Sequence, residues 1–513
     1  MLLLCLLLLP TVGAALVFVV PARLDRAGRA AATVVAGLVL LVAAGLWLWR
    51  DPGGGLLGSA PLSSGPLPAP IWHELDLAWV PALHLRFHLV LDVISYPLVV
   101  LTALLTLLCC GYTWWRTPTA AGEARPAGGA RLAALLLLIE VGVLGTFLAG
   151  DLALFFLSFE IVLLPMYAVI VGWGGADRTR AGRLFALYTL LGSVLLLVGV
   201  FVVVNAAGTA DIAALTGGVG LSRGVQFTAF ALFALAFAVK APLWPLHSWL
   251  PAAHTQAPTV GSVLLAGVLL KMGTYGLIRI GVGVTPLGLH AAAPILGAFA
   301  VAAIIVGSLV CLAQSELKRL IAYSSVGHMG FVLLGIATGT PMGLRAALIG
   351  NIAHGLITGL LFFLVGEVKD RTGTGELAAL GGLRERAPAL AGVLGFAAIA
   401  SLGLPGLAGF WGEAFAVVAA VEVGGGFWIT LAVLAALGGA LTAAYFLRLL
   451  RVVSHGEPSS AVLGMAGSST AVSWWTWAPL VALTVAVGVV PVLALAPVGE
   501  IGPALSRLTE GLR

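Results

Sequence analysis

Apolar stretches of membrane-spanning length alternate with short polar loops over most of the 513 residues. A helix of about 20 apolar residues crosses the hydrocarbon core of a bilayer, and glycine, proline and charged residues punctuate such helices. Hydropathy taken together with this punctuation predicts an all-α polytopic membrane protein with about 14 transmembrane helices. The expected spans lie near residues 1–20, 30–49, 89–112, 131–149, 151–173, 183–206, 226–250, 258–280, 290–313, 318–338, 344–366, 388–420, 427–450 and 475–498.

Two of the expected spans are interrupted by proline and glycine. In the seventh span Pro242 and Pro245 follow Lys240, and in the twelfth the break falls within residues 401–413. A proline removes a backbone donor and clashes with the preceding turn, so both helices should break at membrane depth. The breaks lie five spans apart, an odd number, which predicts two inverted five-helix repeats, helices 4–8 and 9–13. The expected domains are residues 1–130 (helices 1–3 and loops), 131–280 (first repeat), 281–453 (inverted second repeat) and 454–513 (helix 14 and tail).

The composition fits this architecture, with 60% hydrophobic and 9% charged residues. Such a chain has no soluble domain of appreciable size. The first apolar run has no basic residues before it, so we expect a first spanning helix and no cleaved signal. Most of the 26 Lys and Arg residues fall in loops on one side, which the positive-inside rule places in the cytoplasm, with both termini on the outer face. The Gly- and Pro-rich loop 51–87 suits an outer-face cap or a short hairpin.

Several classes of chemistry are not expected. The four Cys residues lie in apolar runs without metal-ligand spacing, so we expect no disulfide, metal site or iron–sulfur cluster. No nucleotide-binding glycine motif or haem motif occurs, so electron transfer must take place in other chains. The net charge of +5 reflects the basic loops and does not indicate a nucleic-acid partner.

Ionisable residues near the middle of the expected spans are the candidate functional groups. Glu160 lies about nine residues into its span, on the order of 14 Å deep, where a lone carboxylate needs a partner. Lys240 is the expected partner, and because attraction and desolvation oppose each other, moving the two groups together or apart would switch their protonation. A static structural ion pair is the alternative. The full set, which predicts a proton relay across the membrane mid-plane, is Glu160, Lys240, Lys271, His328, His354 and Glu413.

Further residues are candidates for the proton path. His247 and His254 lie seven residues apart after the proline break and could carry protons between Lys240 and the surface or Lys271, with helix-end hydrogen bonding as the alternative. Glu140 in the fourth span and Lys318 at the start of the tenth could extend the path, or Glu140 could pair with a neighbour.

Four blocks of sequence resemble the proton-conducting membrane family shared by respiratory complex I and Mrp-type cation/proton antiporters. They are Phe159-Glu160 with residues 165–167, then residues 240–254, 271–276 and 318–330. The likeness covers nearly the whole chain, and Glu413, where other members carry Lys, distinguishes one of the antiporter-like subunits of complex I from the other two. The chain departs from the family pattern at Phe159, where Trp is common, and at Leu407-Ala408.

The resemblance implies both a function and a role for each candidate residue. Glu160 would pair with Lys240, Lys271 would be the central relay, Glu413 the exit-side residue, and His247, His328 and His354 the connections. The chain would pump protons across the inner (plasma) membrane of a bacterial-type cell, driven by NADH oxidation and quinone reduction in partner subunits. Those partners would hold FMN, iron–sulfur clusters and the quinone, and two other antiporter-like subunits would flank the chain in the bilayer. The alternatives are an Mrp-type cation/proton antiporter subunit and a scaffold whose charges are only structural.

Overall fold

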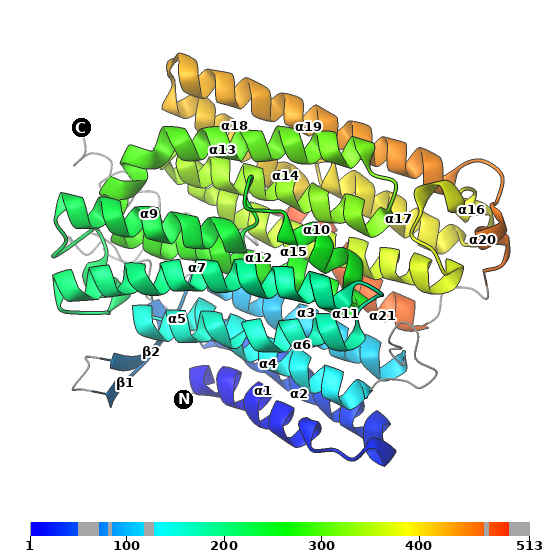
Figure 1. Cartoon of the computed structure of the whole chain (residues 1–513), viewed down its shortest axis with the longest axis horizontal. Coiled ribbons are helices and arrows are strands. Elements are labelled where there is room, and N and C mark those ends of the chain that lie inside the picture. The colour runs from blue at the N-terminus through cyan, green and yellow to red at the C-terminus, as the bar shows by residue number, and fades with distance from the viewer. Residues whose placement is uncertain (1, 50–70, 81–84, 117–127, 466–470, 492–513) are drawn as a thin grey trace.

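Helices make up most of the residues that the computed structural model describes, which are 2–49, 71–80, 85–116, 128–465 and 471–491. The long helices run roughly side by side as one bundle (Figure 1). From the N-terminus the α- and π-helices, long and short, are α1 (Leu2–Phe18), α2 (Asp25–Leu48), α3 (Tyr96–Trp115), α4 (Gly129–Leu148), α5 (Leu152–Ile161), α6 (Leu163–Trp173), α7 (Arg178–Ala207), α8 (Ile212–Leu215), α9 (Arg223–Lys240), α10 (Trp249–Gln256) and α11 (Thr259–Leu264). They continue as η4 (Leu265–Leu269), α12 (Leu270–Gly276), η5 (Leu277–Val282), α13 (Pro286–Ala313), α14 (Leu317–Ala337), α15 (Pro341–Thr372), α16 (Leu383–Arg386), α17 (Pro388–Ser401), α18 (Ala408–Val423), α19 (Gly425–Ser454), α20 (Ser460–Leu463) and α21 (Ala471–Val489).

The helices account for the predicted spans. In the described part of the chain, 12 helical stretches are long and apolar enough to cross a membrane by length and composition, and α1 and α17 are shorter apolar helices. Each expected span overlaps one helix or one interrupted helical stretch, and residues 492–498 of the last span lie outside the described residues. Large apolar side chains stay exposed along the outward faces, as on α7, where Leu187 and Phe201 are both 65% exposed. A protein in water rarely exposes apolar faces of this extent, so these faces are explained by contact with lipid.

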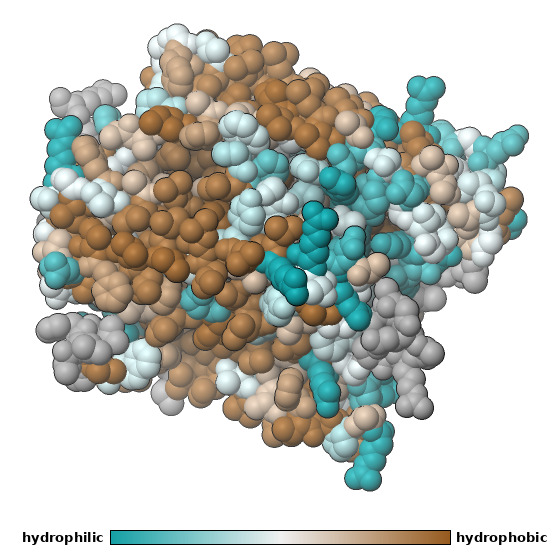
Figure 2. Space-filling model, viewed as in Figure 1, coloured by the Kyte–Doolittle hydropathy of each residue, from teal (hydrophilic) through white to brown (hydrophobic). Residues whose placement is uncertain are grey.

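The surface of the bundle is divided into an apolar region and a polar region. Brown apolar side chains form a broad continuous area over the middle of the visible face, and teal polar side chains gather toward the right-hand end, where α16 and α20 lie (Figure 2). The two described strands, β1 (Ile71–Val80) and β2 (Leu85–Asp92), lie at the opposite end of the bundle (Figure 1).

One predicted boundary is wrong. The third span was expected to begin near residue 89, but residues 85–92 form a strand and α3 begins only at Tyr96. A short apolar run such as this one does not by itself distinguish strand from helix. The side chain of Asp92 accepts hydrogen bonds from the backbone N–H groups of Ile94 and Ser95, at 3.0 and 2.9 Å, and so forms the turn that separates the strand from α3.

The two strands form an antiparallel hairpin of β1 (Ile71–Val80) and β2 (Leu85–Asp92). This hairpin lies in the region where a cap or short hairpin was expected, while residues 51–70 and 81–84 of that loop lie outside the described residues.

A backbone arrangement recurs at two places in the bundle. Asp151 forms an isolated antiparallel bridge with Asp211, and Glu316 forms one with Glu376. Asp151 and Glu316 are also the side-chain N-caps of α5 and α14. Between the two bridges the chain runs along the bundle an odd number of times, through α5–α6, α7, α9–α10, α11–η5 and α13, so the bridges lie at opposite ends.

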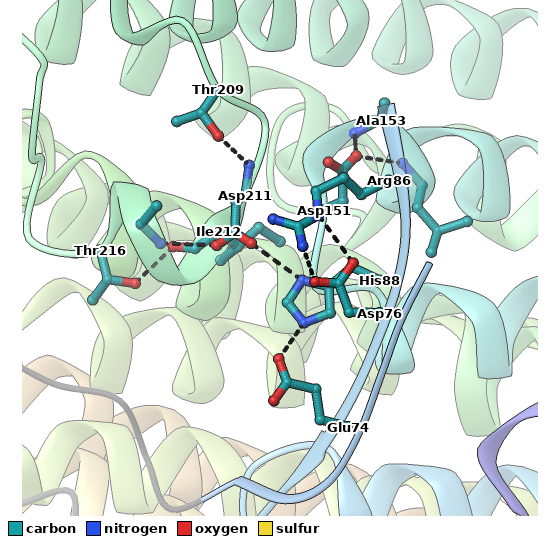
Figure 3. A network of polar contacts seen from close by, with 12 residues as sticks. Glu74, Asp76, Arg86, His88, Asp151, Ala153, Thr209, Asp211, Ile212 and Thr216 are labelled. Carbon is teal, nitrogen blue, oxygen red and sulfur yellow. Dashed lines mark hydrogen bonds and ion pairs between the residues drawn. The ribbon is translucent and has the colours of Figure 1, made fainter. Parts of the chain in front are cut away.

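A buried histidine fastens the hairpin to the bundle (Figure 3). The His88 ring lies between two carboxylates, with Nε2 2.7 Å from Glu74 Oε1 and Nδ1 3.2 Å from Asp211 Oδ2. The His88 carbonyl also accepts a hydrogen bond from the Gly150 N–H at 2.8 Å. The close contact with Asp211 raises the pKa of His88 above 6.5 and lowers the pKa of Asp211 below 3.8.

These shifts predict that hairpin docking weakens as pH rises. Because the pKa of His88 is raised in the folded protein, its contribution is fully present below pH 6.5 and is lost as pH rises through the raised value. Hydrogen exchange of the amides in residues 71–80 and 85–92, corrected for intrinsic exchange, should therefore accelerate across that range. His88→Gln should remove this pH dependence, whereas His290→Gln, at an exposed position, should retain it. An unchanged pH dependence in His88→Gln would contradict this assignment.

Candidate functional site

Both predicted helix breaks are present. The seventh span stops at Lys240 and resumes as α10 at Trp249, and the twelfth stops at Ser401 and resumes as α18 at Ala408. In the first break the indole Nε1–H of Trp249 donates to the Val239 carbonyl at 3.0 Å. This bond satisfies a carbonyl near the end of the interrupted helix, as backbone at membrane depth requires.

The buried cation Lys271 lies in the middle of the helix that runs from α11 to η5. Its side chain is fully buried, and Nζ lies 2.6 Å from His354 Nδ1 on α15. Nζ also donates to the Ala266 carbonyl in η4. The segments η4 and η5 are π-helical and flank α12, and such wide turns commonly occur at functional sites.

From His354 the polar contacts continue to Glu413. The rings of His354 and His328 are 5.9 Å apart between centroids. His328 Nδ1 lies 3.0 Å from Glu413 Oε1, and His328 Nε2 lies 3.0 Å from Ser401 Oγ. A cavity of about 30 Å³ is lined by His328, His354, Ser401 and Glu413. Lys271 does not line it. That volume gives room for a water molecule among polar partners.

The expected pair of Glu160 and Lys240 is not in direct contact. The Glu160 carboxylate accepts a hydrogen bond from Ser193 on α7. The Lys240 ammonium instead lies 4.6 Å from the centroid of the Phe159 ring, and in the described part of the chain it has no hydrogen-bond partner. The predicted ion pair between Glu160 and Lys240 is therefore not formed in this structure, and pairing after a movement of the two side chains remains a prediction.

The remaining candidate residues lie on α10, in the first helix break and on α4. His254 on α10 is fully buried, its ring stacks on Phe362 at 4.5 Å, and neither ring nitrogen has a hydrogen-bond partner among the described residues. His247 lies in the first break, edge-on to Tyr323 at 6.0 Å between centroids. Glu140 on α4 is fully buried, and both of its carboxylate oxygens lack partners within the described ranges.

Lys318 lies beside a large cavity at the end of the bundle opposite the hairpin. Its buried Nζ donates to the Ala257 carbonyl at 2.9 Å. The cavity, of about 640 Å³, is also lined by Arg116, Lys369 and Asp370. Arg116 is neutralised by acids on α15, with NH2 3.2 Å from Glu367 and NH1 3.3 Å from Asp370. The cavity therefore lies next to a buried ammonium and is large enough to hold several water molecules.

Two serines in the site were not identified from the sequence. Ser193 contacts Glu160 and Ser401 contacts His328. Serine in an apolar helix usually bonds to its own preceding turn, as Ser193 also does with the Thr189 carbonyl, so the residue type alone carries no signal. The position of Ser401 as the last residue before the second break was the available clue.

The arrangement of these side chains suits proton transfer. In the part of the chain that is described, no group of three or more His, Cys, Asp or Glu is placed to hold a metal ion. The groups that do converge are proton donors and acceptors joined through hydrogen-bonding distances or a short gap.

Comparisons with known proteins identify the family of the chain. The family described as NADH:quinone oxidoreductase/Mrp antiporter, TM, matches residues 149–438. The chain is 41% identical to NADH-quinone oxidoreductase subunit M of Rhodobacter capsulatus over 85% of this chain and 84% of that protein. It is 42% identical to NAD(P)H-quinone oxidoreductase chain 4 1 of Synechococcus sp. over 74% of this chain and 71% of the relative.

Two solved structures share the fold over 99% of this chain. A chain of respiratory complex I from Thermus thermophilus with bound NADH matches with a TM-score of 0.85 at 30% identity, over 99% of its length. A chain of the Mrp complex from Dietzia sp. matches with a TM-score of 0.83 at 25% identity, over 97% of its length.

The first helix break yields a prediction about stability. Trp249→Phe removes the donor to the Val239 carbonyl and keeps most of the buried ring. Leaving that carbonyl unsatisfied should lower the free energy of unfolding by about 1–3 kcal/mol, measured by thermal or denaturant unfolding in detergent. Trp244→Phe is the control, because Trp244 lies in the same break and packs on Phe299. Equal losses in the two variants would show that the hydrogen bond is not the cause.

Proposed function

Because the chain belongs to the transmembrane family of NADH:quinone oxidoreductases and Mrp antiporters, we propose that it is a proton-translocating membrane subunit of an NADH:quinone oxidoreductase. Its role corresponds to that of the relatives named subunit M. NADH oxidation and quinone reduction take place in partner subunits, which hold FMN and the iron–sulfur clusters. The other membrane subunits, including two more antiporter-like subunits on either side, are its partners in the bilayer.

The observation that carries this proposal is the line of contacts from Lys271 to Glu413. The Lys271 ammonium donates toward His354 Nδ1, so proton transfer there leaves a neutral amine and an imidazolium. The imidazolium then passes its Nε2 proton into the small cavity, where Ser401 and a water molecule connect to His328 Nε2. His328 releases its other proton from Nδ1 to Glu413. Each step uses a group that accepts on one side and donates on the other.

The recurring backbone bridges support an inverted repeat behind this relay. Bridges at opposite ends, together with two broken helices, fit two five-helix units of opposite orientation, helices 4–8 and 9–13. We assign them to residues 131–280 and 281–453, with residues 1–130 before them and 454–513 after them. Each unit then supplies one half of the path, and the halves meet at Lys271.

Proton uptake takes place from the cavity beside Lys318. His254 is a fully buried ionisable residue on α10, and we assign it as the connection between the cavity and the central relay. The end of the bundle with this cavity faces the cytoplasm, and the hairpin faces outward, as the distribution of basic residues indicates. Glu140 and His247 are additional members of the path, His247 serving Lys240.

Substitutions within the relay should stop pumping in the assembled complex. Lys271→Ala and Glu413→Gln should each reduce NADH-driven proton uptake into inverted membrane vesicles at least about tenfold, because each removes a titrating group from the line. NADH oxidation with an artificial acceptor should be unchanged. Glu422→Gln is the matched control, since Glu422 lies exposed on the same helix as Glu413. Near-normal pumping by Lys271→Ala or Glu413→Gln would refute the relay.

An Mrp-type cation/proton antiporter subunit is the second candidate function, favoured by the likeness to the Dietzia Mrp complex. That function predicts sodium- or potassium-dependent proton movement in vesicles without NADH, and the proposed function predicts none. A scaffold whose charges are only structural predicts that Lys271→Ala lowers the amount of assembled complex but leaves pumping per complex unchanged. Vesicle assays normalised to complex content separate the three outcomes.

A further inference from the structure

The ring of Phe159 occupies the place where a carboxylate partner for Lys240 was expected. Lys240 is the last residue of α9 and is 2% exposed, so its ammonium is cut off from bulk water. Nζ lies 4.6 Å from the centroid of the Phe159 ring, and it has no hydrogen-bond partner among the residues described. An ammonium over an aromatic face is attracted by the ring quadrupole, and the attraction strengthens when water is excluded.

The ring is held in this orientation by its neighbours. Phe159 is 1% exposed and stacks on Phe155 with centroids 6.0 Å apart and planes 25° apart. Phe237 lies edge-on to the same ring, at 6.3 Å and 67°. The face toward Lys240 is therefore presented by a packed aromatic cluster and not by a freely rotating side chain.

Glu160 is held away from Lys240 on its own side. Its carboxylate accepts a hydrogen bond from Ser193 on α7. Phe159 and Glu160 are consecutive on α5, and consecutive helical residues point about 100° apart. The Lys240 ammonium can therefore lie either over the Phe159 ring or against the Glu160 carboxylate. In this structure it lies over the ring.

We propose that Phe159 is a positioning residue of the proton relay, whose ring competes with Glu160 for the Lys240 ammonium and holds the pair open. This inference rests on the proposed pumping function. The competition depends on charge, because a neutral amine has no comparable attraction to the ring. The ring therefore delays closure of the ion pair while Lys240 carries its proton and has no hold on Lys240 after the proton leaves.

Graded fluorination tests this role in the assembled complex. Phenylalanine carrying one, two or three ring fluorines in place of Phe159 withdraws electron density from the ring face with little change in shape. NADH-driven pumping should fall stepwise with each fluorine and reach about a tenth of the normal rate, because a weaker ring lets the ion pair stay closed. The same series at Phe155 is the matched control. Phe155 is fully buried on the same helix, and no cation lies over its ring among the described residues.

A structural readout separates positioning from packing. In the complex with Phe159→Leu, electron cryomicroscopy should find Lys240 Nζ in direct contact with the Glu160 carboxylate, and Phe159→Trp should restore the open arrangement and pumping. Equal effects of fluorine at both phenylalanines, or an open pair in Phe159→Leu, would overturn the inference.

The two proposals fail in distinguishable ways. Normal pumping by Lys271→Ala refutes the pumping function itself. Loss of pumping by Lys271→Ala, combined with no effect of fluorine at Phe159, leaves that function standing and refutes only the positioning role.

Discussion

The fully buried ammonium of Lys271 is the constraint on which the rest of the structure depends. A cation cut off from water costs several kcal/mol even after relaxation, so the surrounding helices must offer it electron pairs. They do so with the Ala266 carbonyl in a π-helical turn and with His354 Nδ1. An imidazole so close to an ammonium does not readily take up a second positive charge. The charge can therefore be passed from one group to the other, but the pair resists holding two charges at once.

The broken helices are the structural cost of placing polar groups at this depth. Each break frees backbone groups that lipid would not satisfy, and the protein answers with aromatic donors. At the first break Trp249 Nε1 donates to the freed Val239 carbonyl, and near the second break Trp411 Nε1 donates to the Gly488 carbonyl of the neighbouring helix α21. These two tryptophans place an indole N–H beside the polar groups and an apolar ring among the helices.

The sequence predicted most of the fold because hydropathy, proline and charge act locally. The helices, both breaks and the ionisable groups of the proposed relay come from residues that stand out against an apolar background. Residues 89–92, the end of the second strand, were assigned to the third span because their apolar run also continues a helical pattern. The contacts of Ser193, Ser401 and Phe159 were missed for a different reason. They depend on which faces of distant helices meet, and residues such as these are common in any membrane helix.

The direction of the relay relative to the helices has a consequence for energy conversion. Lys271, His354 and His328 each lie near the middle of a long helix, so the line through them runs across the bundle and not along it. In a membrane, the electrical potential changes along the helix axes and is nearly constant across them. Moving a unit charge through the whole potential takes about 2.3 kcal/mol per 100 mV. In the proposed mechanism, proton steps along this line therefore cost almost no electrical work, and the membrane potential acts on the steps that bring protons to the line and release them from it.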